Sequence, residues 1–597
     1  MLQTYVVRSC WRRSRQHERT TFFGRGFAAP DPPPICIIRI TMLDFTSYLR
    51  PHEVEAALHA FAAAYPQLCT LQSLGQSHEG RPIWCATLTN QATGADTTKP
   101  AFWLDANLHA TEVTGCMGAL HAIQTILQRY GHDPRATQLL DQRALYIVPC
   151  LNPDGMEQAL TSPVYVRSGT RRYPYTDERD GLYPADIDGD GLIVEMRVPD
   201  PDGGWKVSEH DPRLMRRRGP DEVGGTYYRV YKEGLIRNYD GQQVKIAPPA
   251  QGLDFNRNYP YVWQPEGEQR GAGPYPGSEP EVRAVIAFLT SHLNVSCAIA
   301  YHTFSGVLLR PYADKADDQM AIEDLWTYKE IGERGKQLTG YPHLSVYHGF
   351  RYHPREIMSG AFDDWAYHQL GIFAWTVELW DMIGEAGIKE RDFIAWLREH
   401  PEEDDLKLLR WNDEHLEGKG FVNWRPFEHP QLGPVEIGGW IERRTFGNPP
   451  EKFLLKTLEP NTEFVIAHAL MTPRLEVREP EVTALGGDLY RVRVLIANSG
   501  YLPTYGSKRA QAAKVVRPIE VQLTLPNEAS LVTGELRQEL GQLEGRANKR
   551  ALWGANYPTD NLRRLEWTLH APQGGSLTIC ARSQRAGHAE VSMVLGR

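Results

Sequence analysis

The sequence predicts an open α/β fold, with a mixed β-sheet flanked by helices, followed by a C-terminal all-β sandwich. Two observations indicate this division. Between residues 42 and 385, apolar runs typical of buried strands alternate with helical apolar periodicity, which favours a sheet covered by helices. Beyond about Thr472 the pattern changes to short alternating runs separated by Gly and Asn turns, which is typical of a sandwich.

Composition excludes several classes of protein. The formal net charge of -9 provides no basic field, so we expect no nucleic-acid partner. No apolar run approaches the ~20 residues of a membrane span, so we expect no membrane partner. The eight cysteines are scattered without Cys-x-x-Cys pairs, which is typical of buried thiols in a reducing compartment. We therefore expect a cytoplasmic protein and favour a monomer.

Residues 1–41 precede the first helical pattern and are rich in arginine. Their longest apolar piece, Ile35 to Ile38, is too short for the core of a signal peptide. A Pro-rich stretch, 30–34, separates this leader from Met42. We expect 1–41 to be disordered or to be translated upstream of a working start at Met42, with an Arg-rich transit peptide as the alternative.

The first half of the chain is expected to form one helix, a hairpin, and two buried strands with a helix between them: helix 43–65, strands 69–74 and 83–88, strand 101–106, a helix after Glu112 and strand 144–149. The turn signal 152–155 ends the last strand. Residues 161–250 are long, polar and rich in Gly, Pro, Asp and Arg. We expect an elaborated loop region there and not a core layer.

The second half of the chain again alternates helices and strands before the pattern changes to that of a sandwich. Its expected elements are helix 279–292, strand 295–301, helix 321–339, a helix through Trp365 and strand 371–377. Residues 386–471 are expected to form a helical and loop extension packed on this unit. The strands expected in the sandwich, 472–597, are 474–477, 489–496, 519–525, 564–569, 576–581 and 589–595.

Four acid and imidazole side chains follow predicted strands. His109 and Glu112 come after strand 101–106, and His302 and Glu378 follow the two later strands directly. Sheets of this kind bind ligands at the carboxyl ends of their strands. A lone His or Glu there is usually a satisfied polar residue, but imidazole nitrogen and carboxylate oxygen together are a ligand set that suits Zn²⁺.

These motifs, in order and over roughly residues 43–385, resemble the zinc metallocarboxypeptidases of the pancreatic carboxypeptidase A and B type. The resemblance implies a catalytic domain at 42–385. It implies that His109, Glu112 and His302 bind one catalytic Zn²⁺ and that Glu378 is the general base. Zinc would lower the pKa of its water toward about 7.

The resemblance also assigns residues that bind and polarise the substrate. The family's carboxylate-binding motif is similar to the segment 252–258, where Asn256 and Arg257 would bind a free C-terminal carboxylate. Arg167 lies where the family has its carbonyl-polarising arginine, although Arg171 and Arg172 are close and an ordinary solvated basic loop is the alternative.

Two further positions concern the tyrosine that caps the substrate and the base of the side-chain pocket. The first of them departs from the family pattern. Counting back from Asp364-Trp365 to the substrate-capping tyrosine reaches Glu356, and the nearest tyrosine is Tyr352. A loop of different length would give the role to Tyr352; the alternative is that Glu356 takes over part of it. The residue before this Asp-Trp pair, at the base of the family's side-chain pocket, is Asp363. An acidic floor implies a preference for C-terminal Lys or Arg.

A second ion site is suggested by a run of carboxylates within the 161–250 region. Asp186, Asp188 and Asp190 alternate around a glycine turn and Glu195 follows, which resembles a compact Ca²⁺ loop. Asp-Gly clusters are equally ordinary turn chemistry. The sequence leaves both interpretations open.

The function expected from these residues is zinc-dependent hydrolysis of the C-terminal peptide bond of peptides, with a preference for basic C-terminal residues. One alternative is a zinc amidase acting on a non-protein or cell-wall peptide substrate. Another is a catalytically inactive peptide-binding module, for which loss of the base would be the signature. The presence of Glu378 argues against that last alternative.

Overall fold

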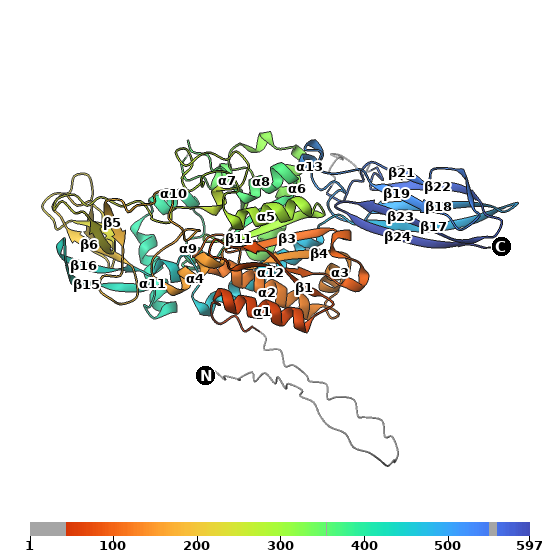
Figure 1. Ribbon diagram of the computed structural model, residues 1–597. Helices are drawn as coiled ribbons and strands as arrows, with labels where there is room; N and C mark the ends of the chain where they lie inside the picture. The colour runs from red at the N-terminus through yellow and green to blue at the C-terminus, as the bar shows by residue number, and fades with distance from the viewer. Residues whose placement is uncertain (1–42, 354, 548–557, 597) are drawn as a thin grey trace, which may run out of the picture. The chain divides into compact units, whose positions relative to one another are not determined.

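The protein is described by a computed structural model that covers residues 43–353, 355–547 and 558–596; the expected leader, 1–41, lies outside these residues. Its central element is an eight-stranded sheet (Figure 1). In spatial order the strands are β1 (Cys69–Gln76), β2 (Pro82–Leu88), β4 (Ala144–Val148), β3 (Ala101–Ala106), β11 (Val295–Thr303), β14 (Phe373–Leu379), β12 (Val307–Arg310) and β13 (His343–Ser345).

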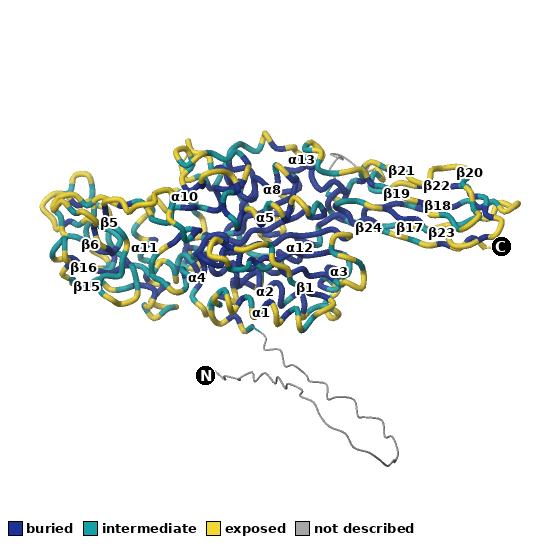
Figure 2. The backbone as a smooth tube through the Cα atoms, viewed as in Figure 1, coloured by how far each residue is buried: buried dark blue, intermediate teal, exposed yellow. Residues whose placement is uncertain are grey.

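The middle of this sheet is parallel and its flanks contain antiparallel pairs. β4, β3, β11 and β14 run in one direction, so their carboxyl ends share one edge. β1 pairs with β2 as the expected hairpin, and β12 returns antiparallel to β14. Every residue of β3 and β11 is buried (Figure 2), as expected for strands covered on both faces. The predicted α/β fold is confirmed.

Helices cover the sheet, and two of the longer helices of the protein come from the extension after the catalytic segment. The main helices are α1 (Pro51–Ala64), α2 (Val113–Arg129), α3 (Pro134–Gln142), α5 (Pro280–Ser291), α6 (Ile322–Thr339), α8 (Phe362–Leu370), α11 (Glu402–Leu416) and α12 (Glu451–Leu470). α12 packs on α2 and α6, and its Leu454, Leu458 and Phe464 belong to the main hydrophobic core. The last helix of the extension is therefore part of the main core.

The segment 152–155, expected to be a turn, begins a helix. Asn152 is the N-cap of α4 (Pro153–Thr161), and its side-chain oxygen accepts a hydrogen bond from the Gly155 amide at 2.9 Å. Asn is a preferred N-cap and Pro a preferred first helical residue. The same residues therefore served as a helix start where a turn was expected.

The expectation that 161–250 is an elaborated loop region and not a core layer was wrong. The segment contains six short strands: β5 (Gly181–Pro184), β6 (Glu195–Pro199), β7 (Trp205–Val207), β8 (Met215–Arg217), β9 (Tyr228–Lys232) and β10 (Gly234–Arg237). Four of them join β15 (Phe421–His429) and β16 (Gly433–Trp440) in a six-stranded sheet. Met196 and Ile437 lie in its small separate core. Strands of three to five residues are too short to show periodicity.

The C-terminal region is mainly β, as predicted, and includes a short helix, α13 (Lys508–Ala512). Its two four-stranded antiparallel sheets have the orders β17-β18-β22-β20 and β21-β19-β23-β24. The strands are β17 (Leu475–Gly486), β18 (Leu489–Asn498), β19 (Glu520–Thr524), β20 (Ser530–Thr533), β21 (Arg537–Glu539), β22 (Leu562–His570), β23 (Gly575–Ser583) and β24 (Gly587–Leu595). Val492 and Trp567 from one sheet share a core with Ile579 from the other.

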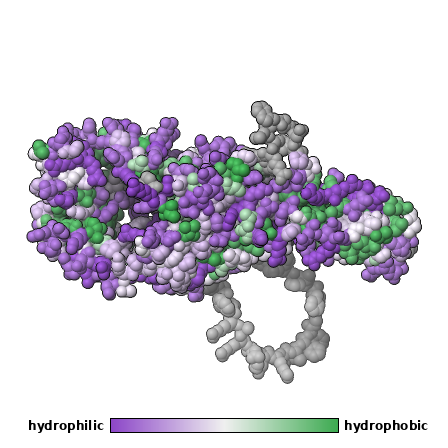
Figure 3. Space-filling view, turned by 90° about the horizontal axis from the view of Figure 1, so that it is seen from above, coloured by the Kyte–Doolittle hydropathy of each residue, from purple (hydrophilic) through white to green (hydrophobic). Residues whose placement is uncertain are grey.

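No helix in the described part of the chain is long and apolar enough to cross a membrane. The face drawn in Figure 3 is mostly hydrophilic, with hydrophobic side chains scattered in small groups.

Candidate active site

His109 and Glu112 are held in the short segment between β3 and α2. Asn107, which has a positive φ of 59°, donates from its side-chain amide to the backbone oxygens of His109 (3.1 Å) and Ala110 (3.3 Å). Asn tolerates this left-handed backbone better than most residues. Glu112 then occupies the N-cap position of α2. The segment thus presents both side chains at the carboxyl edge of the sheet.

His302 and Glu378 lie near the carboxyl ends of two neighbouring strands. The register of these strands places the two residues side by side. His302 is in β11 and Glu378 is its direct partner in β14, so both strands end two residues later than expected. β11 also pairs with β3, which precedes His109. Three neighbouring parallel strands therefore position all four predicted residues.

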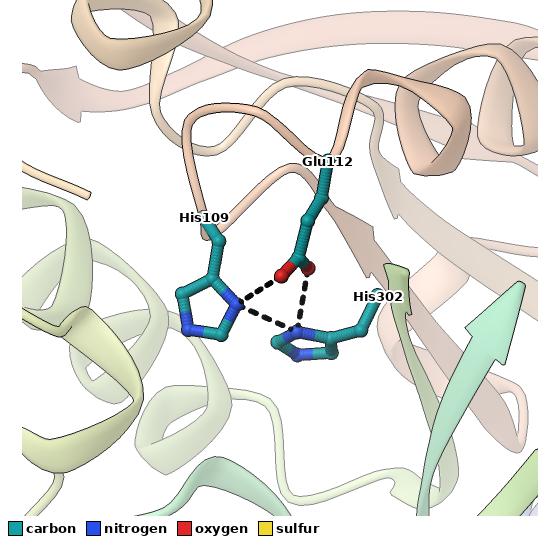
Figure 4. A group of neighbouring side chains, drawn as sticks. All are labelled: His109, Glu112 and His302. Carbon is teal, nitrogen blue, oxygen red and sulfur yellow. Dashed lines mark hydrogen bonds and ion pairs between the residues drawn. The ribbon is translucent and has the colours of Figure 1, made fainter. Parts of the chain in front are cut away.

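The three predicted ligands converge on one point (Figure 4). His109 Nδ1 is 2.8 Å from Glu112 Oε1, and His302 Nδ1 is 3.0 Å from both His109 Nδ1 and Glu112 Oε2. All three side chains are buried. Burial lowers the pKa of His302, which keeps the ring in the neutral form that binds metals.

This donor set fits zinc. Two imidazole nitrogens that face each other across 3.0 Å cannot both carry a proton there, whereas one cation between them and the carboxylate satisfies all three. Two histidines and a glutamate leave an open coordination position, which is the pattern of catalytic zinc sites. His109, Glu112 and His302 are therefore the residues that would hold Zn²⁺.

Asp254 supports the zinc ligands, and sequence reasoning missed this role. Its Oδ1 lies 3.1 Å from His109 Nε2, and its Oδ2 accepts from Arg167 Nε at 3.1 Å. A carboxylate on the second nitrogen of a ligating histidine fixes the ring's tautomer and orientation. The available signal was its place two residues before Asn256-Arg257, although only the fold brings it to His109.

Arg167 reaches the site, and the two neighbouring arginines do not. Its Nη1 donates to Glu112 Oε1 at 3.1 Å, whereas Arg171 pairs with Glu279 and Arg172 with Glu178. Tyr352 is 48% exposed. The structure thus brings Arg167 to the ligands and leaves Tyr352 on the exposed side.

Glu378 has the properties of a base in a low-dielectric site. Its Oε2 is buried and has no hydrogen-bond partner among the described residues. Burial raises the pKa of Glu378 well above the ordinary value, and the negative charges of Glu112 and Asp363 raise it further. A carboxylate with a raised pKa is a better proton acceptor near neutral pH.

Asn256 and Arg257 lie in the short 3-10 turn η3 (Phe255–Arg257), close to α8. Asn256 Oδ1 accepts from the Phe362 amide at 2.8 Å. The Arg257 side chain is buried, with 6% of the residue exposed. Within the described residues its guanidinium donates to the Asn256 carbonyl oxygen (2.7 Å) and the Met358 sulfur (3.2 Å). No carboxylate of the described chain bonds to this buried cation, as expected of an arginine that binds an anionic ligand.

Asp363 is in the first turn of α8 and is buried. Its Oδ1 accepts from the Asp364 amide at 3.0 Å, and its Oδ2 has no partner among the described residues. Burial raises the pKa of Asp363 to about 6. Asp364, by contrast, accepts from the Ala313 amide with both oxygens. Asp363 is thus the carboxylate with an oxygen left for a ligand.

The four carboxylates expected to bind calcium do not form one group. The set within metal-binding distance is Asp186, Asp188 and the buried Glu233. Asp190 and Asp188 are both ion-paired with Arg425. Glu195 is in β6, with Lys232 at 4.0 Å. The run is a turn closed by backbone amides and an arginine from β15, a partner that lies more than 230 residues away in the sequence.

The sequence profile described as zinc carboxypeptidase matches residues 54–385, more than half of the chain, and includes every predicted zinc ligand. The chain belongs to the zinc carboxypeptidase family. The resemblance stated from the motifs is confirmed. A second profile, described as a domain of unknown function (DUF8731), matches residues 474–594, which lie in the C-terminal β region.

Individual relatives are distant. Mouse carboxypeptidase A2 is 26% identical over 351 residues, which are 58% of this chain and 65% of that protein, so the chain spans less than two thirds of its length. Mouse carboxypeptidase M is 31% identical over 134 residues, 22% of this chain and 30% of that protein. The crystal structure of thrombin activatable fibrinolysis inhibitor aligns with a TM-score of 0.40 and 18% identity, over 71% of this chain and 74% of that one.

Proposed function

We propose that this protein is a zinc-dependent carboxypeptidase that removes the C-terminal residue of peptides and prefers Lys or Arg at that position. The observation that carries the proposal is Arg257, a buried guanidinium without a carboxylate partner in the described chain. It lies close to Asp254, which contacts the zinc ligand His109. An exopeptidase needs such an anion site near its hydrolytic centre.

The side chains around the ligands have distinct parts in the reaction. Bound Zn²⁺ would supply Lewis acidity and lower the pKa of a water ligand. Glu378 would accept the proton of the attacking water on its unpaired oxygen and later deliver it to the leaving amine. Arg167, which has donors beyond those used by Glu112 and Asp254, would stabilise the developing oxyanion by about 3 to 4 kcal/mol.

Asn256 and Arg257 would fix the substrate end, and Asp363 would select its side chain. A planar guanidinium binds a carboxylate with two parallel hydrogen bonds. An ionised Asp363 with a free oxygen would pair with the charged end of a Lys or Arg side chain. Leaving that buried carboxylate unpaired beside an apolar side chain costs binding energy, which is the origin of the expected preference.

The test compares blocked dipeptides that end in Arg, Lys or Leu, each with a free carboxylate or a C-terminal amide. We expect cleavage of the free acids only, with Arg and Lys preferred. Arg257→Ala should lower kcat/KM by about 10- to 100-fold, since a charged hydrogen-bonded pair contributes about 1.5 to 3 kcal/mol. The matched control is Arg172→Ala, whose exposed side chain pairs with Glu178. Equal cleavage of amides and acids by the wild type would refute exopeptidase activity.

Asp363→Asn separates the preference from the activity. We expect the ratio of kcat/KM for C-terminal Arg over C-terminal Leu to fall by about 10- to 100-fold, with Leu cleavage retained. An unchanged ratio would refute the role of Asp363 and leave the carboxypeptidase proposal standing.

A further inference from the structure

The helix that carries Asp363 is held at its other end by the C-terminal domain. α8 begins at Phe362 and ends at Leu370, and Gly371 and Ile372 connect it directly to β14, which carries Glu378. Figure 1 shows α8 beside α13 (Lys508–Ala512), a short helix of the region that follows β18. One continuous segment of the catalytic domain thus links the proposed specificity residue, this contact and the proposed base.

Three side chains of the C-terminal region bind the carbonyl oxygens at the end of α8. Arg509 Nε donates to the His368 oxygen at 2.7 Å. Arg585 donates to the oxygens of Leu370 and Gly371, the latter at 2.8 Å, and Ser507 Oγ donates to the Gly371 oxygen at 2.8 Å. We call Ser507, Arg509 and Arg585 the α8-capping residues.

These contacts provide hydrogen-bond donors for carbonyl groups at the end of the helix. The last carbonyl groups of an α-helix have no partner within the helix and carry partial negative charge, so cations there are stabilising. Arg585 is only 1% exposed, and the only acceptors of its hydrogen bonds among the described residues are these carbonyl oxygens. A buried cation placed on a helix end constrains both partners, because moving either leaves the other unsatisfied.

The backbones at the end of α8 and in α13 also lie close together. Gly371 has a φ of +64°, and a Cβ there would lie 2.5 Å from the backbone nitrogen and Cβ of Ala510. Asp324 of α6, also buried, accepts from the amides of Lys508 (2.8 Å) and Arg509 (2.9 Å) and from the Tyr367 hydroxyl (2.8 Å). α6, α8 and α13 are therefore joined through one carboxylate.

The opposite end of α8 meets the substrate-binding residues. The Phe362 amide donates to Asn256, and Asp363 is in the next position. A helix of nine residues is about 13 Å long and behaves as a rigid element, so tilting its end displaces its beginning. A displacement of about 1 Å at a reacting or binding group can cost about 100-fold in rate.

We propose that the C-terminal domain is a positioning element of the active site, in which the α8-capping residues fix α8 and the start of β14 and thereby the placement of Asp363 and Glu378. The proposal rests on the proposed function for its kinetic readout. It gives the domain of unknown function an indirect part in catalysis, through residues that touch neither zinc nor substrate.

The test uses the full chain loaded with zinc and three variants: Arg585→Gln, Arg509→Gln and the conservative Arg585→Lys. The control is Arg493→Gln, an arginine of the same domain that pairs with Glu566. We expect Arg585→Gln to keep its zinc, to lose about 10- to 100-fold in kcat/KM, and to lose preference for C-terminal Arg over Leu. Arg585→Lys should recover part of the preference, and the control should match the wild type.

A second readout does not need a substrate. Amide hydrogen exchange should become faster across 362–373 in Arg585→Gln, including its first turn, and stay unchanged in the control. If the wild type cleaves no peptide, the proposed function fails and exchange alone decides this inference. Should Arg585→Gln not fold, Arg509→Gln carries the same two measurements. Unchanged selectivity together with unchanged exchange at 362–366 would overturn the proposal.

Discussion

The sequence offers two groups of possible metal ligands, the zinc group and the carboxylates of the turn at 186–190, and the two groups differ in what their oxygen and nitrogen atoms already bind. In the zinc group, His109, Glu112 and His302 turn ligand atoms toward one shared point. In the turn at 186–190, the carboxylates accept backbone amides, and Arg425 pairs with two of them. Donor type and spacing therefore do not define a metal site: in the zinc group two imidazole nitrogens face each other across 3.0 Å, whereas in the turn Arg425 already supplies a cation to Asp188 and Asp190.

The largest expected effect comes from breaking the zinc group itself. His302→Ala should abolish stoichiometric zinc binding and lower kcat/KM by about 1000-fold or more, because the metal contributes several kcal/mol of transition-state stabilisation. Metal analysis and peptide hydrolysis measure both. Chelation of the wild type followed by zinc addition should reproduce the loss and its reversal. Full activity of a metal-free protein would contradict the assignment.

Glu378→Gln should separate chemistry from metal binding within the same region. The amide cannot take a proton from water, so we expect kcat to fall by about 100- to 10,000-fold while zinc content stays at the wild-type level. Single-turnover hydrolysis together with metal analysis would show this. A variant that loses zinc and activity in parallel would mean that Glu378 serves the metal site and not proton transfer.

A matched pair of Asp→Asn variants compares the zinc group directly with the turn at 186–190. Asp254→Asn should weaken zinc affinity by about 10- to 100-fold, because it removes the carboxylate that orients His109. Asp188→Asn should leave zinc affinity unchanged. Competition with a chromophoric chelator measures both constants, and equal affinities for the two variants would show that Asp254 is not a supporting residue.

The acids of the zinc region also interact with each other, which predicts a shift in pH dependence. The charge of Asp363 raises the pKa of Glu378, so Asp363→Asn should allow Glu378 to ionise at lower pH. Because the ionised form is the base, the acidic limb of kcat/KM for a C-terminal Leu substrate should move to lower pH. A profile that stays fixed, or moves to higher pH, would contradict this coupling.

The smallest effect is expected in the acidic turn. The side chain of Arg425 is 43% exposed, and an exposed ion pair contributes about 0.2 to 1 kcal/mol. Arg425→Gln should therefore lower the free energy of unfolding by no more than about 1 kcal/mol. Millimolar Ca²⁺ should raise Tm more in this variant than in the wild type if Arg425 competes with a cation. Denaturation of both proteins with and without Ca²⁺ checks this, and strong stabilisation of the wild type would restore the calcium hypothesis.

The sequence predicted the parts of the site that a local pattern marks, and it did not predict those that depend on partners distant in the sequence. His109, Glu112, His302 and Glu378 were found because each follows a strongly apolar strand, and neighbouring parallel strands must bring their ends together. Asp254, Arg425 and the strands of the 161–250 segment were not found in these roles. Each depends on a partner distant in sequence, with no periodic pattern to mark it: Asp254 on His109, Arg425 on Asp188, and β6 on β16.

The pairing of β6 with β16 has a consequence for how the chain folds during synthesis. Arg197 in β6 lies opposite Glu436 in β16, and the two side chains form an ion pair at 2.8 Å. At about 5 to 20 residues per second, β6 waits on the order of 10 to 50 s before its partner strand leaves the ribosome. During that time the edge of β6 is open to other strands, which is a known route to misassembly. We therefore expect this edge of β6 to need protection from other strands while the chain is incomplete.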